Sequence, residues 1–188
     1  MSPARLVLPS TAPAFGDVRL RAFEDRDVDM VMNLSTDPYV PKTGSLRGNV
    51  GREGALAYIE RQNGHLDTGV GYSFCVADRD TDEALGTASL WLAPLASGRA
   101  TAGYSVAPRS RGRGIAGRAL IALTRFAWSI PELWRIELNI EPWNVASART
   151  AESAGYEREG LLRSHQEIGG KRVDMLLYAK IRQIGAGH

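Results

Sequence analysis

The chain has a single cysteine, Cys75, and only three histidines among its 188 residues. One cysteine excludes an internal disulfide framework and favours a reducing compartment, so we expect a cytoplasmic protein with Cys75 buried in a strand. The histidines His65, His165 and His188 are scattered without the spacing of metal ligands, and no metal is expected. No apolar stretch approaches the roughly 20 residues of a membrane span, so we expect no membrane association.

Net charge is also nearly lacking. The 23 basic and 21 acidic residues leave a formal net charge of +2, which does not favour general nucleic-acid binding. A hydrophobic fraction of 44% is enough for a core, and the length suits one domain. We expect a flexible leader over residues 1–16, a single domain over residues 17–183, and a frayed end at residues 185–188.

Basic residues gather in one glycine-rich stretch, Thr101–Leu120. Thr101–Ala107 has the pattern of a strand, which Pro108 ends because proline has no N–H to donate. From Gly114 onward, apolar residues recur at helical spacing. A helix that begins there presents unpaired backbone N–H groups and the positive end of its dipole to an anion. The stretch therefore predicts a cradle for a diphosphate group.

Two common phosphate-binding motifs fit this stretch less well. A Walker loop needs a lysine after its glycines, and none follows here. The glycines at 112, 114 and 117 do match GxGxxG, but a dinucleotide fold places that motif after the first strand of a parallel βαβ repeat. The position of the motif in the chain and the strand before it argue against a dinucleotide site.

The run Arg111-Gly112-Arg113-Gly114-Ile115-Ala116 resembles the [QR]-x-x-G-x-[GA] signature of the GNAT acetyltransferases, which are coenzyme-A-dependent N-acyltransferases. The resemblance implies that these residues hold the diphosphate of acetyl-CoA, the cosubstrate. It also implies that the strand before the turn and the next parallel strand splay apart, so that the pantetheine arm enters between them. Ser105, Val106 and Ala107 then offer backbone groups to the arm, with the Val106 N–H as an oxyanion donor.

Hydrophobic periodicity and turn residues along the whole chain predict an α/β fold. Expected strands cover residues 18–23, 71–77, 84–92, 101–107, 134–141, 156–166 and 171–182, and expected helices cover residues 25–35, 53–62, 114 to near 131, and 144–154. This order resembles the GNAT fold, which implies a mixed, mostly antiparallel central sheet flanked by helices. The run VRLRAFEDRDVDMV resembles the RimJ/RimL branch, known for acetylating amino-terminal amines of ribosomal proteins.

A second family element follows the strand at 134–141. The run Asn144-Val145-Ala146-Ser147 resembles the N-x-x-S of the RimJ/RimL branch, where the asparagine contacts the coenzyme and the serine protonates the departing thiolate. Ser147 is therefore a candidate general acid, and Asn144 is also suited to cap the helix. Many GNAT enzymes carry a tyrosine acid one turn further on, and here that position is Ala151.

The acceptor amine needs a base, because a protonated amine cannot attack a thioester. The RimJ/RimL branch places a glutamate at the position that Gln166 occupies here, and glutamine cannot take a proton. Glu167 is adjacent but points to the opposite face of a strand, whereas Glu141 lies nearest the Asn144 turn. Glu141 and Glu167 are the leading candidates, followed by His165 and a water relay.

Three other residues are open to two interpretations. Asp174 matches an acid common in the branch and suits either substrate binding or a structural hydrogen bond. Trp91 and Trp143 flank the expected cleft, where an aromatic ring packs either on a substrate or on the core.

We therefore expect an N-acyltransferase that moves an acetyl group from acetyl-CoA to a primary amine, either a protein amino terminus or a small molecule. A monomer and a homodimer are both expected states, and nucleic acid is not an expected partner. Two alternatives stay open. Gln166 and Ala151 suit a non-catalytic acyl-CoA sensor or scaffold, and the basic turn alone suits a nucleic-acid-binding module. The loops at 39–52 and 93–99 carry no acidic run, which disfavours polycationic acceptors such as aminoglycosides.

Overall fold

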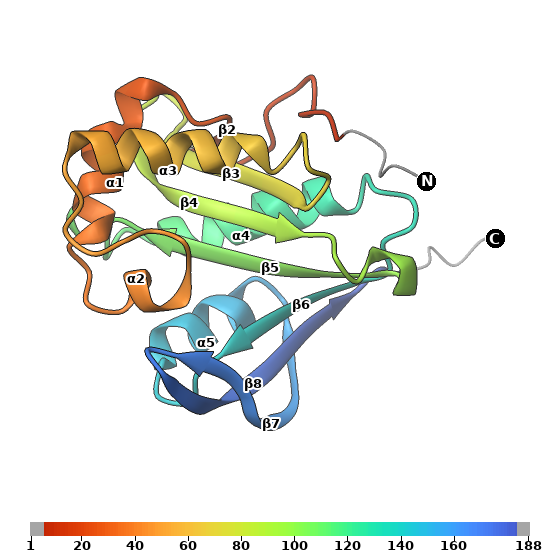
Figure 1. Cartoon of the computed structure of the whole chain (residues 1–188). Coiled ribbons are helices and arrows are strands. Elements are labelled where there is room, and N and C mark those ends of the chain that lie inside the picture. Colours follow the sequence, from red (N-terminus) through yellow and green to blue (C-terminus); the bar gives the residue numbers. More distant parts are fainter. Residues whose placement is uncertain (1–5, 184–188) are drawn as a thin grey trace.

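The computed structural model describes residues 6–183. One eight-stranded sheet runs through this part of the chain in the order β1-β2-β3-β4-β5-β6-β8-β7 (Figure 1). The strands are β1 Ala14–Phe15, β2 Val18–Arg21, β3 Gly71–Asp78, β4 Ala84–Trp91, β5 Arg99–Val106, β6 Arg135–Ile140, β7 Glu157–Ile168 and β8 Lys171–Ile181. Neighbouring strands are antiparallel except for the parallel pair β5 and β6, which confirms the expected mixed sheet.

Helices cover both faces of this sheet (Figure 1). They are α1 Val28–Ser35, α2 Val40–Thr43, α3 Arg52–Gly64, α4 Ile115–Ala127 and α5 Val145–Ser153, with short 3-10 turns η1 Asp25–Asp27, η2 Leu95–Ser97 and η3 Pro108–Ser110. Along β3, Tyr72 and Phe74 pack with α4, whereas Cys75 packs with α1 and α3. Because side chains alternate between the two faces of a strand, α4 lies on one face and α1 and α3 lie on the other. Cys75 is buried in its strand, as expected.

The sheet opens between β5 and β6. The two strands pair only over residues 99–101 and 135–137 and then diverge, with β6, β8, β7 and α5 bending away from β5 (Figure 1). Beyond that point β5 is held by β4 up to Val106, and β6 is held by β8 up to Ile140. Each strand keeps one partner, so the sheet splits without breaking either ladder. The expected splay of the two parallel strands is confirmed.

The amino-terminal segment differs from the expected flexible leader. Residues 14–15 form β1, and Leu6 and Leu8 pack against the core. Gly16 turns the chain from β1 into β2 with a φ of 59°, a left-handed conformation that glycine adopts without steric cost. The described part of the leader is therefore attached to the sheet, because its apolar side chains pack against the hydrophobic core.

A short helix, α2, lies in the segment 39–52, where the sequence lacks periodicity. One turn of four residues is too short to display the helical repeat in its apolar side chains, which explains why the sequence did not predict it. Within residues 6–183 no helix is both long and apolar enough to cross a bilayer. The expected frayed end at residues 185–188 lies outside the described residues.

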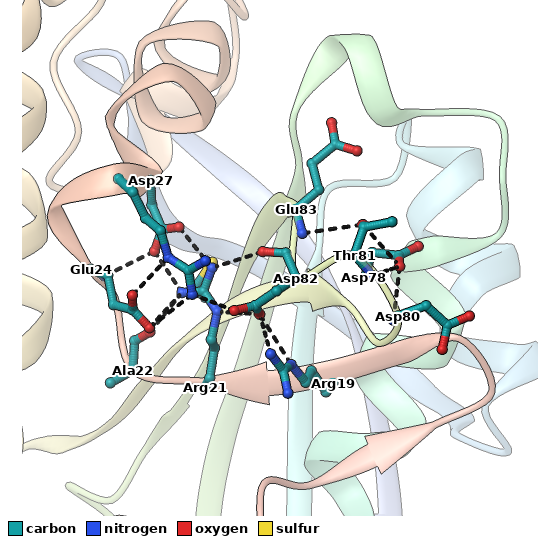
Figure 2. A network of polar contacts seen from close by, with 12 residues as sticks. Arg19, Arg21, Ala22, Glu24, Asp27, Asp78, Asp80, Thr81, Asp82 and Glu83 are labelled. Carbon is teal, nitrogen blue, oxygen red and sulfur yellow. Dashed lines mark hydrogen bonds and ion pairs between the residues drawn. The ribbon is translucent and has the colours of Figure 1, made fainter.

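A polar network joins β2 to the start of α1 and to the turn between β3 and β4 (Figure 2). The Arg21 guanidinium donates two hydrogen bonds of 2.8 Å to the Asp27 carboxylate and a third of 2.8 Å to Asp82. Arg19 and Arg26 also donate to Asp82. Burial works to raise the pKa of Asp82, but the three arginines outweigh it and hold that pKa well below its usual value. Such paired charges fix the edge of the sheet that carries α1.

Candidate active site

A cleft of about 480 Å³ lies where β5 and β6 separate. Its walls come from the segment around α2, from α3, and from β4, β5, β6, the start of α5 and the β7–β8 pair. Residues distant in sequence meet there, including Tyr39, His65, Glu141 and Ser147. The cleft therefore lies at the expected position of the pantetheine arm and extends toward the α3 face of the sheet.

The turn between β5 and α4 forms an open corner beside this cleft. Gly112 and Gly114 have φ values of 78° and 69°, so both need the left-handed conformation that other residues avoid. Gly114 directly precedes α4, whose first N–H groups have no carbonyl one turn back to bind. A methyl group added at Gly112 or Gly117 would meet no atom within 4 Å. The corner therefore presents unpaired donors to open space, as an anion cradle requires.

The side chain of Arg111 turns back from the corner onto the protein. Its Nε donates to the Val106 carbonyl at 3.0 Å, and its Nη2 lies 2.7 Å from the carboxylate of Asp37. Burial works to raise the pKa of Asp37, but bonds from the Val40 and Tyr39 N–H groups and from Arg111 hold it below its usual value. Arg111 thus ties the cradle to the segment before α2, a contact that the sequence pattern does not reveal.

Some backbone N–H and C=O groups at the end of β5 already have hydrogen-bond partners within the chain. The Ala107 N–H donates to the Leu85 carbonyl at 2.9 Å, and the Ala107 carbonyl accepts from the Ser110 N–H at 2.8 Å. Both groups of Ala107 therefore have partners within the chain. Thr87 and Ser105 pair two residues further along the same antiparallel ladder, so the backbone groups of Ser105 also face β4. The backbone groups of Val106 face the open edge of β5, where the Val106 carbonyl accepts from Arg111. Of the three predicted residues, only Val106 therefore has an N–H that faces the expected position of the pantetheine arm.

The start of α5 brings Ser147 to the cleft. The Asn144 side chain accepts from the Ser147 N–H at 3.1 Å, so its expected role as a helix cap is confirmed. The Ser147 Oγ lies 2.9 Å from the hydroxyl of Tyr104, which reaches across the split from β5 and also donates to the Ser147 carbonyl at 3.2 Å. Burial raises the pKa of Tyr104, so its hydroxyl stays protonated at neutral pH.

The three side chains considered as the base, and Gln166 at the position of the family's glutamate, lie in different surroundings. Glu141 lines the cleft, its side chain is only 7% exposed, and its Oε2 has no hydrogen-bond partner among the described residues. Gln166 also lines the cleft, whereas Glu167 and His165 are exposed on β7 and do not. Burial and a hydrogen bond to the Glu141 carboxylate raise the pKa of the Tyr39 hydroxyl. The structure thus brings Glu141 and Ser147 into one cleft and leaves Glu167 outside it.

Comparison with known proteins supplies the family. Residues 17–157 match the family model described as an acetyltransferase (GNAT) domain. The chain belongs to the GNAT acetyltransferase family. An uncharacterized N-acetyltransferase of Bacillus licheniformis is 28% identical over 168 residues, which cover 89% of this chain and 94% of the relative. The expected enzyme class, an N-acetyltransferase, is confirmed.

Solved structures show the same GNAT fold. RimL, a ribosomal alpha-N-protein acetyltransferase in complex with coenzyme A, superposes with a TM-score of 0.75 at 18% identity and covers 90% of this chain and 97% of its own. Spermidine N-acetyltransferase from Vibrio cholerae, in complex with CoA and spermine, superposes with a TM-score of 0.70 at 21% identity and covers 88% and 95%. The first likeness agrees with the resemblance to the RimJ/RimL branch.

Sequence reasoning missed two side chains of this GNAT site. Tyr104 was read only as a strand former, and Tyr39 only as part of a turn-rich segment. Alternation along β5 would have placed Tyr104 on the face opposite Ser105, but its contact with Ser147 depends on how α5 packs. Among the open cases, Asp174 accepts from the Ser164 N–H at 2.7 Å, which matches the structural interpretation.

Of the two tryptophans, Trp91 belongs to the cleft wall and Trp143 packs on a residue of that wall. Trp91 lines the cleft and packs edge-on against His65, with ring centroids 4.8 Å apart. Trp143 is 60% exposed and packs edge-on against Tyr39 at 4.9 Å. Within the described residues no group of three or more histidine, cysteine, aspartate or glutamate side chains is arranged to hold a metal ion.

Proposed function

We propose that this GNAT protein moves an acetyl group from acetyl-CoA to a primary amine by direct attack of the amine on the thioester. One observation carries the proposal. A buried carboxylate with an unpartnered oxygen, Glu141, and a hydroxyl, Ser147, face one cleft between the split strands, beside an open helix N-terminus. Such a cleft supplies a proton acceptor and a proton donor on either side of a bound thioester.

The corner at the start of α4 fits the diphosphate of coenzyme A. The N–H groups of Ile115, Ala116 and Gly117 come at the positive end of the helix dipole. The Arg118 guanidinium lies against Gly114 and donates to the Arg113 carbonyl at 2.6 Å, and its charge is paired with Asp17 at 2.6 Å. We assign diphosphate binding to this corner, and binding of a pantetheine amide to the Val106 backbone N–H on the open edge of β5. Asn144 contributes by fixing the first turn of α5.

Glu141 is proposed as the general base. Its free oxygen accepts a proton from the ammonium form of the acceptor, which leaves the nitrogen lone pair available to attack the thioester carbonyl carbon. The hydrogen bond with Tyr39 holds the carboxylate in place. The proton taken by Glu141 then leaves to solvent, so the base is regenerated after each turnover.

Ser147 is proposed as the general acid. When the carbon–sulfur bond breaks, the electron pair goes to sulfur, and the Ser147 hydroxyl supplies the proton that makes the thiol. The nitrogen, which is positively charged after attack, loses its second proton to solvent, and the Ser147 oxygen takes a proton back from solvent. Tyr104 holds the serine hydroxyl beside the open edge of β5, the strand assigned to the pantetheine arm. The products are the acetylated amine and free coenzyme A, and the acetyl group gains no other atom.

Paired substitutions test the proposal. Glu141→Gln removes the proton acceptor at constant shape, and we expect kcat to fall by about 10²-fold or more. The Kd for acetyl-CoA should stay within about twofold of the native value. Glu167→Gln is the matched control on the exposed face of β7, and we expect it to keep the rate of the native protein. Thiol release and calorimetric titration with coenzyme A measure the two quantities.

A different outcome would favour the sensor alternative. If the native protein binds coenzyme A tightly but acetylates no amine of any class, the protein is a binding module and not a catalyst. If Glu141→Gln and Glu167→Gln act alike, the assignment of the base is wrong even though the enzyme is active.

A further inference from the structure

The wall of the cleft carries very little charge. Among the described residues that line it, Glu141 is the single carboxylate, and there is no lysine or arginine. His65 also lines the cleft, and burial together with the nearby Arg61 lowers its pKa, so the imidazole is neutral at pH 7. Its Nδ1 is occupied by the Ser73 hydroxyl at 2.8 Å. The cleft therefore offers one charge to an acceptor, and that charge is negative.

Two oxygen atoms in this wall have nothing to bind. Asn139 Oδ1 and Glu141 Oε2 are buried and have no hydrogen-bond partner among the described residues. Asn139 lies near the end of β6, Glu141 directly follows the strand, and both residues line the cleft. Buried acceptors without donors are costly, so the site is built for a group with several N–H donors. An amine nitrogen is such a group.

The rest of the wall combines apolar and aromatic side chains with uncharged polar ones. Leu46, Tyr58 and Met175 are buried there, and Trp91 lies beside His65. The hydroxyls and amides that line the cleft carry no charge. A second ammonium or a carboxylate in this cleft would lose part of its hydration without gaining an ion pair, which is unfavourable for a buried ion.

We infer that the acceptor is a primary amine on an otherwise uncharged body. The inference rests on the proposed function, because it assigns the Asn139 and Glu141 oxygens to the acceptor nitrogen. The inference disfavours polyamines as acceptors, because their second ammonium group would have no carboxylate left to pair with in the cleft wall. It also disfavours amino acids, whose carboxylate would lie in a cleft without a cation.

Matched substrates that differ by one charge test the inference. Hexylamine and 1,6-diaminohexane have the same chain, and phenylalanine amide and phenylalanine have the same ring. We expect kcat/KM to be higher for the singly charged member of each pair by about tenfold or more. Equal or reversed ratios would overturn the inference. A neutral tetrapeptide amide with a free amino terminus shows whether the amine comes from a protein end or a small molecule.

A variant adds the missing charge. Gln166→Glu places a second carboxylate in the cleft wall, and we expect it to reduce the preference for hexylamine over diaminohexane by about fivefold or more. His165→Glu is the matched control, since it adds the same charge to the exposed face of β7. An equal effect of both variants would mean that general surface charge, and not the cleft, sets the preference.

Binding gives a readout that does not depend on turnover. Calorimetric titration of hexylamine and diaminohexane into protein saturated with coenzyme A measures acceptor affinity directly. Tighter binding of hexylamine supports the inference even if no amine is acetylated, a result that would contradict only the proposed function. Acetylation of both amines with equal affinity would contradict the inference and leave the proposed function intact.

Discussion

Tyr104 joins the two halves of the split sheet through Ser147, with 2.9 Å between the two hydroxyl oxygens. Burial raises the pKa of Tyr104, so it keeps its proton; its hydroxyl donates to the Ser147 carbonyl and shares a hydrogen bond with the Ser147 hydroxyl, which it orients. Tyr104→Phe removes both contacts at nearly constant shape. We expect kcat to fall by about tenfold with the KM for acetyl-CoA little changed, measured by thiol release.

Tyr178→Phe is the control for that substitution. The Tyr178 hydroxyl donates to Glu152 at 2.9 Å, so this variant also removes one tyrosine bond to α5 but lies outside the described cleft wall. We expect its kcat to match the native value. The double variant Tyr104→Phe/Ser147→Ala should be no slower than Ser147→Ala alone. A further loss in the double variant would show that Tyr104 acts independently of Ser147.

At the scale of the element, the start of α4 depends on one glycine conformation. Gly114 has a φ of 69°, and an added Cβ would come within 3.2 Å of the Arg118 guanidinium. We expect Gly114→Ala to lower the free energy of unfolding by about 1–2 kcal/mol and to weaken coenzyme A binding. Urea unfolding and calorimetric titration measure the two effects.

Gly117 is the matched control for the same helix. It lies inside α4 with ordinary helical geometry, and an added Cβ would meet no atom within 4 Å. Gly117→Ala should therefore raise the free energy of unfolding by about 0.5–1 kcal/mol. If both alanine variants destabilise the protein equally, the left-handed conformation at Gly114 is not the cause.

The segment around α2 is held to the cradle by the ion pair between Asp37 and Arg111. Asp37→Asn keeps an oxygen for the Tyr39 and Val40 N–H groups but loses the charge. Since Tyr39 contacts Glu141 from this segment, we expect the KM for the amine to rise by about threefold or more. The Kd for coenzyme A should stay within about twofold, measured by calorimetry. A change in coenzyme affinity alone would contradict this coupling.

At the scale of the whole molecule, the network in Figure 2 links acid stability to the arginines around Asp82. The pKa of Asp82 is held below its unfolded value of about 3.9. A lowered pKa stabilises the fold above the unfolded value, and this contribution is lost as pH falls toward the folded value. The network therefore contributes fully at pH 7 and progressively less below about pH 4.

Asp82→Asn tests this linkage. Asparagine tolerates the positive φ of 62° at this position, so the backbone is kept while the charge and one acceptor oxygen are lost. We expect the free energy of unfolding to fall by about 1–2 kcal/mol at pH 7 and the difference from the native protein to shrink near pH 3. Urea titrations at both pH values measure it, with Asp25→Asn in η1 as the control. A difference that does not depend on pH would exclude a role for the carboxylate charge.

Local patterns were enough to predict much of this protein. Thr101–Ala127 was predicted as strand, turn and helix because proline, glycine and apolar spacing act over a few residues. Alternation on β6 correctly placed Glu137 and Asn139 on the less buried face of the strand, whereas Glu141 lies just beyond its end. The Asn144 cap was also predicted, because its partner lies three residues away. The motif at Arg111 indicated the family, which the family model confirms.

Tertiary structure alone decided which side chains meet in the cleft. The contacts of Tyr104 with Ser147, of Tyr39 with Glu141 and of Arg111 with Asp37 join segments from different elements. Periodicity reports which face of its own strand or helix a residue occupies, but not which other element packs against that face. For the same reason the sequence ranked Glu141 and Glu167 together, and only the packed sheet places Glu141 in the cleft and Glu167 at its exposed edge.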